Sequence, residues 1–455
     1  MSDEHNPLYS EPYGNTTVQT PNMQSLAGRG AVYENAYCPS PLCMPSRSAF
    51  MAGKRVHELQ TYSNCNLLVD PTPPSFGDAL ARQGVHAAYI GKTDVYTPGN
   101  ALGFSEMIRP GDRKAPGDVN HRRNPMTIRK GARNRANGYG PKANAGTGDI
   151  ACVDQAVQWL QDTAQGMDTP WVLVANVVAP HFPHFSPPEF WDMYPEDGDL
   201  PRHGAECESA QHPYAKAIKR HFETHEFSET QVRGLRRGYL ACISFVDHQL
   251  GRLTQALEIA GLSDSTNVVY TSDHGDMLGK FGMWWKCSLY EDSVRIPMIA
   301  AGPDFARGAR VTTPVDLHDL QASLFAASGA DQPSEYLGEP LQHIPASDTN
   351  RTVFSEYHGH GAPGSAYMIR KGEWKYIHYS GAQSQLFNLT NDPNELTNLA
   401  ETHENVVSEL DAELRIICSP EMENERAEQF IEEQLKTIEE AAEPSVEQRR
   451  GKPRA

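Results

Sequence analysis

The sequence of 455 residues lacks any apolar run of membrane-spanning length, and it does not open with the charged and then apolar segment that directs secretion. We therefore expect no membrane span. As written, the chain would stay in the cytoplasm, whereas a leader upstream of Met1 would direct it to the periplasm or out of the cell.

The sequence is also poor in positive charge. Lys and Arg number 40 against 58 Asp and Glu, which gives a formal net charge of -18. Nucleic acids and anionic surfaces attract basic proteins and repel acidic ones. The composition therefore argues against nucleic-acid binding, and an anionic substrate would need a pocket that is positive locally.

The chain contains eight cysteines but no C-x-x-C pair. Zinc knuckles and dithiol redox sites use that spacing, so the sequence argues against both. Cys38 and Cys43 lie close in sequence, but spacing is the only indication of a disulfide between them. Cysteines scattered in this way fit a reducing compartment.

Three apolar segments are followed by polar residues that can take part in catalysis. The segments are residues 85–91, 171–178 and 267–271. Runs of this kind form strands that are buried on both faces in a parallel sheet. Ligand sites in such sheets lie at the carboxyl ends of the strands. We therefore predict that Lys92, His181, Asp273 and His274, which follow these runs, meet in one crevice.

The segments between these runs have helical spacing. Residues 75–84 predict a short helix that ends at glycine. Asp149 would cap a helix that begins after it, and Ser228 with Gln231 forms a capping box before a long amphipathic stretch. The apolar residues at helical spacing along these segments are predicted to lie in the core.

The composition changes near residue 345. Short segments with turn residues between them predict a small antiparallel sheet, formed by residues 351–357, 365–371, 373–379 and 385–389. The tail from about residue 401 is rich in Glu at helical spacing and ends in a basic stretch at 449–455, which predicts a solvated helix with a frayed end. We predict a catalytic domain over residues 1–345 and a C-terminal subdomain over residues 346–455.

Residues 43–47 form a C-x-P-S-R motif. It resembles the signature of the type I sulfatases, in which a formylglycine-generating or anaerobic sulfatase-maturing enzyme oxidises the cysteine to formylglycine. The resemblance implies an alkaline-phosphatase-like α/β fold: a mostly parallel central sheet flanked by helices, and a smaller C-terminal α+β subdomain with a short antiparallel sheet. It also implies hydrolysis of a sulfate monoester by formylglycine derived from Cys43. Alone, the motif also fits a buried cysteine beside a Pro-Ser turn.

The beginning of the chain departs from this family pattern. Sulfatase-like chains usually have an apolar strand before the aspartate that Asp3 resembles, and two residues precede Asp3 here. We expect either a start codon that is placed late or the loss of this strand.

The resemblance assigns a divalent metal to Asp3, Asp273, His274 and the modified Cys43. Asp273 and His274 begin an Asp-His-Gly-Asp sequence that resembles the second metal segment of sulfatases, although the pair also fits an ordinary turn after a strand. Oxygen-rich coordination favours calcium, with magnesium and manganese as alternatives. Glu4 stands where many relatives have a second aspartate, and its longer side chain leaves its role open.

Further residues resemble the groups that hold the sulfate and its leaving group. Lys92 and Lys286 resemble the lysines that bind sulfate oxygens, and Arg47 would orient the nucleophile segment through bidentate hydrogen bonds. His181 resembles the histidine that contacts the leaving oxygen, and imidazole suits proton donation near neutral pH. His184 is a candidate substrate contact; a zinc pair with His181 is disfavoured by the prolines at positions 180 and 183.

One departure indicates a branch of the family. Most sulfatases have a histidine two residues after the strand-end lysine, and here Asp94 stands there as a candidate base or substrate contact. This feature and residues 355–359, 374–377 and 385–398 resemble the branch of arylsulfatase K (glucuronate-2-sulfatase) and its bacterial relatives. The branch implies a sulfated uronate or other sugar as substrate, with His358 as a further candidate contact.

Residues 109–142 contain ten Lys or Arg against two Asp, without apolar periodicity. A mobile loop of this composition over the crevice would attract an anionic, sulfated small molecule or saccharide. A solvated loop that binds nothing has the same composition, so the sequence leaves both interpretations open.

Two rival functions are compatible with these motifs. A phosphate or phosphonate monoester hydrolase of the same superfamily would use the same nucleophile, and turnover of aryl sulfates against aryl phosphonates separates it from a sulfatase. A non-catalytic sulfoglycan-binding protein would keep Cys43 unmodified, which the mass of the natively expressed chain detects.

Overall fold

The three predicted buried strands form in the computed structural model, which describes residues 1–65, 71–114, 118 and 121–442. One sheet is parallel and has the order β4 (Glu106–Gly111), β3 (His86–Lys92), β6 (Trp171–Asn176). A second sheet is mixed and has the order β10 (Ala309–Val311), β1 (Gly30–Tyr33), β9 (Met298–Ala301), β8 (Val268–Thr271). β9 is antiparallel to both of its neighbours, and β8 belongs to this second sheet and not to the parallel sheet of β3 and β6.

Residues 1–3 connect the two sheets. The Met1 ammonium donates to the Ala175 carbonyl at 2.7 Å, and the Ser2 amide donates to the Thr271 carbonyl at 2.9 Å. Ser2 and Asp3 also form parallel bridges, to Ser272 and Pro180 respectively. The first residues therefore lie between β6 and β8, and they bring Asp3 to the carboxyl ends of both strands.

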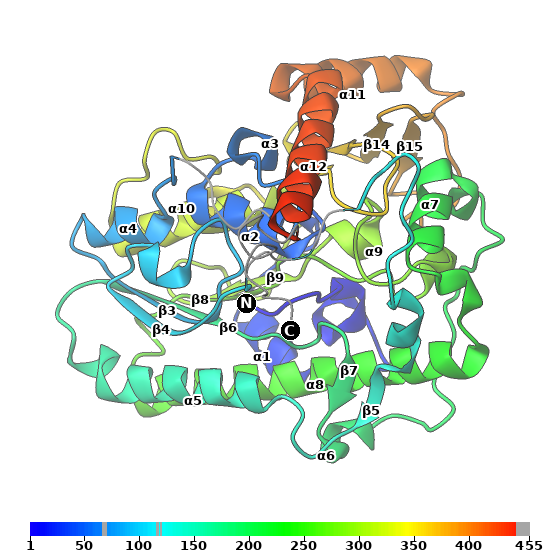
Figure 1. The fold of residues 1–455 in the computed structure, drawn as a ribbon. Helices are drawn as coiled ribbons and strands as arrows, with labels where there is room; N and C mark the ends of the chain where they lie inside the picture. Colours follow the sequence, from blue (N-terminus) through cyan, green and yellow to red (C-terminus); the bar gives the residue numbers. More distant parts are fainter. Residues whose placement is uncertain (66–70, 115–117, 119–120, 443–455) are drawn as a thin grey trace, which may run out of the picture.

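Helices cover both faces of the sheets (Figure 1). On one side lie α5 (Thr147–Asp162) and α8 (Glu229–Ile259); on the other lie α2 (Cys43–Ala52), α4 (Phe76–Ala81) and α10 (Leu317–Ser328). The capping box of Ser228 and Gln231 begins α8 as predicted.

The prediction that Asp149 caps a helix was wrong, because α5 begins at Thr147 with Gly146 as its N-cap. The Asp149 carboxylate instead accepts hydrogen bonds from the amides of Val178 and Ala179, at 2.7 and 2.9 Å. These amides follow the end of β6 and need an acceptor there. Asp149 therefore supports the loop that leads to His181.

The remaining helices and strands complete the body and its C-terminal part. The helices are α1 (Pro21–Arg29), α3 (Val56–Leu59), α6 (Pro188–Trp191), α7 (Pro213–His221), α9 (Glu291–Val294), α11 (Glu404–Ile417) and α12 (Pro420–Ala442). The strands are β2 (Ala36–Tyr37), β5 (Tyr139–Pro141), β7 (His184–Ser186), β11 (Val315–Asp316), β12 (Thr352–Tyr357), β13 (Ala366–Lys371), β14 (Trp374–Tyr379) and β15 (Gln385–Asn388).

The predicted C-terminal antiparallel sheet is present in the order β12-β13-β14-β15. Lys375 of β14 is fully buried, and its ammonium binds Glu291 at 2.9 Å and Glu395 at 2.7 Å, which fixes this sheet to the body. A domain boundary near residue 345 stays a prediction. The predicted frayed end at 449–455 lies outside the described residues.

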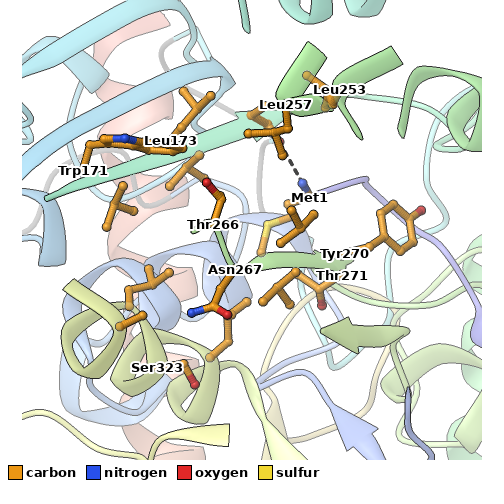
Figure 2. A pocket seen from close by; sticks show the side chains of 18 of the residues that line it. Met1, Trp171, Leu173, Leu253, Leu257, Thr266, Asn267, Tyr270, Thr271 and Ser323 are labelled. Atoms are coloured by element: carbon orange, nitrogen blue, oxygen red, sulfur yellow. Dashed lines mark hydrogen bonds between the residues drawn. The ribbon is translucent and has the colours of Figure 1, made fainter. Parts of the chain in front are cut away.

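An apolar cavity of about 430 Å³ lies between β6 and β8 (Figure 2). Leu173 of β6, Tyr270 of β8 and Leu257 of α8 line it together with Met1. Burial, followed by the charge of Arg47, lowers the pKa of the Met1 amino group to about 5. The lining contains none of the polar strand-end residues predicted to meet, so this cavity is separate from their crevice.

Within the described residues, no helix combines the length and the apolar character that a membrane crossing requires.

Candidate active site

Cys43 is the first residue of α2, a helix whose ten residues are all buried. Its Sγ lies 3.2 Å from Lys286 Nζ and 3.4 Å from His274 Nε2. Burial and the carboxylate of Asp3 act to raise the pKa of the thiol, but Lys286, Lys92 and His274 outweigh them and lower it to about 6. The start of a helix also favours negative charge. Position 43 is therefore an anion-stabilising position. Cys38 and Cys43 are both free thiols.

Four of the predicted metal ligands come together at this position. Donor atoms of Asp3, Cys43, Asp273 and His274 lie within 4.8 Å of one another, and all four side chains are buried. Burial opposes protonation of His274, but the charges of Asp273 and Cys43 together outweigh it and raise the His274 pKa to about 9. Two buried carboxylates and an imidazole form a donor set that suits a divalent cation.

Glu4 lies outside this group of four and groups with Asp3 and His181 instead. Its Oε2 is 3.2 Å from Lys286 Nζ, and its Oε1 is buried without a hydrogen-bond partner. Burial raises the pKa of Glu4 to about 8 against the opposing charge of Lys286. An acceptor atom that is buried and unsatisfied beside the cluster is a position where a cation or a donor of the substrate fits.

Arg47 divides its donors between two carboxylates. Nε binds Asp273 at 2.7 Å and Nη2 binds Asp3 at 3.3 Å, while Nη1 reaches the Asn176 side chain at 3.2 Å. The side chain is only 2% exposed. Arg47 thus forms single bonds to two different carboxylates rather than the predicted bidentate pair, and these bonds tie α2 to the ends of β6 and β8.

The two predicted sulfate-binding lysines both reach the cluster. Lys92 is the last residue of β3 and forms ion pairs with Asp3 and, at 3.5 Å, with Asp94. Lys286 contacts Cys43 and Glu4, as described above. Burial acts to lower the pKa of each lysine, but the neighbouring negative groups raise it. Both lysines are therefore cations beside the cluster.

His181 lies beside the cluster and is 18% exposed. Its Nδ1 donates to the Phe182 carbonyl at 2.6 Å, since a carbonyl can only accept. Its Nε2 lies 3.4 Å from Glu4 Oε2. Burial, followed by the charge of Lys286, holds the His181 pKa well below its usual value.

Asp94 is committed to ion pairs at the edge of the cluster. Arg113 binds it through two donors, at 2.7 and 2.8 Å. Burial would raise its pKa, but Lys92 and then Arg113 lower it to about 2. A group with this pKa is a poor base near neutral pH, so the geometry favours a positioning role for Asp94.

The histidines at 184 and 358 are placed away from the cluster. His184 Nδ1 donates to the Leu235 carbonyl at 3.0 Å, and the ring is fully buried. His358 bonds to Glu356 at 2.7 Å and to Ser365 at 2.8 Å in the C-terminal part. Neither lines the cavity beside Cys43. Direct substrate contact by either residue has no support in this geometry.

A cavity of about 130 Å³ opens beside the reacting position. Its lining residues are Leu42, Asn64, Arg113, Asp118, Arg129, Arg135, His181, Phe182, Phe222, Trp285, Lys286, Cys287 and His360. The basic segment 109–142 supplies four of these residues, three of them arginines, and the sequence indicated the segment but not which members face inward. Asn176, which holds Arg47, was missed altogether because a lone asparagine after a strand carries no pattern.

Two other basic residues of the segment 109–142 form ion pairs away from the cavity. Arg122 pairs with Glu432 at 2.8 Å and Arg133 with Glu226 at 2.5 Å, and both arginines are largely exposed. The segment therefore combines solvated surface pairs with cations that face the cavity.

Comparison with known families and curated proteins gives matches over most of the chain. The family described as Sulfatase matches residues 2–330, and N-sulphoglucosamine sulphohydrolase, C-terminal, matches residues 279–419. Arylsulfatase K of Danio rerio is 29% identical over 479 residues, which cover 95% of this chain and 86% of the relative. Choline-sulfatase of Rhizobium meliloti (strain 1021) is 32% identical over 403 residues, which cover 84% of this chain and 78% of the relative.

Solved structures share the fold over nearly the whole chain. A protein solved in complex with its substrate D-glucosamine-2-N,6-O-disulfate has a TM-score of 0.72 and 20% identity, covering 94% of this chain and 98% of that one. A phosphonate monoester hydrolase from Silicibacter pomeroyi has a TM-score of 0.71 and 20% identity, covering 93% and 94%. At this identity the likeness shows the fold alone, and it confirms the alkaline-phosphatase-like architecture.

Proposed function

The chain belongs to the sulfatase family, and from this premise we propose that its substrate is a sulfated saccharide, and specifically a sulfated uronate. Family membership makes it a sulfuric ester hydrolase, which converts a sulfate monoester into an alcohol and inorganic sulfate. The saccharide is supported by the disulfated glucosamine bound to a protein of the same fold. The uronate is supported by the similarity to arylsulfatase K and by the branch motifs in the sequence.

One observation carries the assignment of the reaction to this site. Cys43, the residue of the C-x-P-S-R motif, lies against Lys286 and His274 and within the same cluster as Asp3 and Asp273. These residues come from distant parts of the sequence, and only the fold brings them together. A sulfate group at this position would meet the start of α2 and two lysines in a protein whose net charge is -18.

The residues of the chain divide the chemistry between them. Sulfate oxygens repel a nucleophile, and Lys92 and Lys286 are placed to offset that charge as it develops. Arg47 holds Asp3 and Asp273 in position. His181, with Nδ1–H committed to a carbonyl, directs Nε2 toward the leaving oxygen. Its pKa is low in the free site, so Nε2 carries a proton to donate only when the bound anionic ester favours the imidazolium.

Two groups that the family implies fit the residues present. A divalent cation, for which we propose calcium, would be held by Asp3, Asp273 and His274 and would supply positive charge to the sulfate oxygens. Formylglycine made from Cys43 supplies the hydrated aldehyde as nucleophile. Because Cys43 is fully buried, we propose that a maturation enzyme of the formylglycine-generating or anaerobic type modifies the chain before it folds.

The test is a set of esters given to the protein produced together with a maturation enzyme. Sulfate release is measured from saccharides sulfated at single defined positions and from 4-nitrophenyl sulfate, and release of the phenol is measured from an aryl phosphonate monoester. The proposal predicts release from sulfated uronates with a kcat/KM well above that for the phosphonate. Faster hydrolysis of the phosphonate would favour the rival hydrolase. Retained thiol at Cys43 with no turnover would favour a binding protein.

A further inference from the structure

The cavity beside Cys43 has an excess of positive charge that the sulfate site does not use. Among its described lining residues, Asp118 is the one carboxylate, against Arg113, Arg129, Arg135 and Lys286. Arg113 is bound to Asp94 and Lys286 to Glu4. Arg129 and Arg135 are therefore the cavity-lining cations whose charge is least balanced by neighbouring carboxylates.

Arg135 lines the cavity without a carboxylate partner among the described residues. No Asp or Glu oxygen in this part of the chain lies within 4.0 Å of its guanidinium nitrogens. The guanidinium instead stacks on aromatic rings, with Cζ 4.2 Å from the centroid of Phe182 and 5.1 Å from that of Trp285. A planar guanidinium on an aromatic face keeps its edge donors free for a planar anion.

Arg129 lines the same cavity, and its charge is only partly neutralised by a carboxylate. Its Nη2 is 3.6 Å from Asp118 Oδ2, a carboxylate that it shares with Arg113, whose Nη1 is 3.4 Å from Oδ1. Nη1 of Arg129 lies 3.4 Å from His360 Nε2. One shared carboxylate therefore faces two guanidinium groups here, and Arg135 adds a third.

The part of the cavity that Arg129 and Arg135 line adjoins the sulfate site. Lys286 Nζ lies 5.7 Å from the centroid of the same Phe182 ring that Arg135 covers. Phe182 also directly follows His181, which is placed for the leaving oxygen. Two substituents of one sugar can therefore reach the sulfate site and the arginines together.

We propose that Arg129 and Arg135 form a second anion site that binds a carboxylate or a further sulfate on the sugar that carries the scissile ester. The inference rests on the proposed function and deepens it, because it assigns substrate selection to these two residues. The rings of Phe182, Phe222 and Trp285 would otherwise suit a quaternary ammonium group. Since Arg135 lies over them, the ammonium group of a zwitterionic ester such as choline sulfate would be repelled from this position.

The experiment compares sulfate esters that differ in the charged group they carry besides the scissile sulfate. Matured wild-type protein is given a sulfated uronate, the same sugar with its carboxyl reduced to an alcohol, a disulfated sugar without a carboxyl, and choline sulfate. A charge-assisted hydrogen-bond pair predicts a loss in kcat/KM of about tenfold to hundredfold when the carboxyl is reduced. The uronate and the disulfated sugar reveal which anion the site prefers, and choline sulfate is expected to be the poorest substrate.

Single substitutions test whether Arg129 and Arg135 cause the preference for the acid over the alcohol. Arg135→Gln and Arg129→Gln are expected to reduce the preference for acid over alcohol by at least about tenfold, and Arg135→Lys to restore part of it. Arg133→Gln is the matched control, because Arg133 lies two residues from Arg135 and points to Glu226 on the surface. The Arg133→Gln variant should show the same preference for the acid over the alcohol as the wild type.

Two results would overturn the proposal in distinguishable ways. Equal kcat/KM for the acid and the alcohol in the wild type, or choline sulfate as the best substrate, would overturn the second anion site and leave the sulfatase assignment intact. Absence of sulfate release from every ester by protein that carries formylglycine would overturn the proposed function and this inference with it. The comparison of esters in the wild type needs no variant, so poor folding of a variant does not weaken it.

Discussion

Arg47 of α2 donates through Nε to Oδ2 of Asp273 at 2.7 Å, and neither side chain is more than 2% exposed. Asp273 follows β8, and the same guanidinium reaches Asp3 between the two sheets. One arginine therefore aligns the start of the nucleophile helix with two carboxylates of the candidate metal site. The C-x-P-S-R motif thus contains both the proposed nucleophile position and the arginine that binds the carboxylates beside it.

Arg47→Met should destabilise the protein strongly. Removing one partner of a buried ion pair costs about 3–5 kcal/mol, because the other charge stays buried without compensation. We expect a fall of this size in the free energy of unfolding, measured by urea denaturation in the presence of a chelator. Arg310→Met is the control, since Arg310 pairs with Glu34 at the surface and is half-exposed, and it should cost less than about 1 kcal/mol. Equal losses in the two variants would contradict the role of Arg47.

The ion pairs of Asp94 predict a dependence of stability on acidity. Its folded pKa of about 2 lies below the ordinary value of about 3.9 in an unfolded chain. A depressed carboxylate pKa stabilises the fold above the unfolded pKa, and this contribution is lost as the pH falls from about 4 to about 2. The shift corresponds to about 2 kcal/mol.

The measurement is the difference in unfolding free energy between the wild type and Asp94→Asn at several pH values. We expect the wild type to be more stable at pH 6 and the difference to shrink as the pH falls toward 3. Asp154→Asn serves as the control, because Asp154 is half-exposed. A difference that is constant with pH would be inconsistent with the ion pairs of Asp94.

Binding of a divalent cation should stabilise the folded protein. A ligand at about 100 times its Kd contributes about 2.7 kcal/mol, so calcium added to chelator-treated protein should raise the Tm. Magnesium and manganese are compared at the same concentration. Asp273→Asn is expected to abolish the rise and Asp304→Asn, at the surface, to preserve it. If none of the three cations changes the Tm of the wild type, the metal site is disproved.

His181 and His184 should respond differently to substitution. A proton donor contributes about 10²- to 10⁴-fold to the rate, and esters with poor leaving groups need it most. His181→Gln should therefore lower kcat far more for a sulfated saccharide than for 4-nitrophenyl sulfate. His184→Gln should lower both by the same factor, because His184 bonds to the Leu235 carbonyl away from the cavity. If His181→Gln lowers kcat equally for both esters, His181 does not donate the proton to the leaving oxygen.

Much of the site could be predicted because each part leaves a local pattern. Buried strands are readable as apolar runs, and the residues at their carboxyl ends meet where the two sheets adjoin, which is how Lys92, His181 and Asp273 were found. The C-x-P-S-R motif then supplied Cys43 and Arg47. The C-terminal strands were found in the same way, by alternation and turn residues.

The other features depend on packing between distant segments. Asp149 looks like a helix cap in sequence, yet the amides after β6 bind it more directly. No pattern in residues 109–142 separates Arg135, which faces aromatic rings, from Arg133, which faces solvent. The antiparallel neighbour of β8 was also hidden, because a short buried strand has the same composition in either direction.

The most direct measurement is the mass of the peptide that contains Cys43, taken from protein produced with and without a maturation enzyme, together with sulfate release by the same two samples. The account predicts that the aldehyde at position 43 and the release of sulfate appear together, and that the unmodified thiol accompanies an inactive protein. Full sulfate release by protein that retains the thiol at position 43 would contradict it.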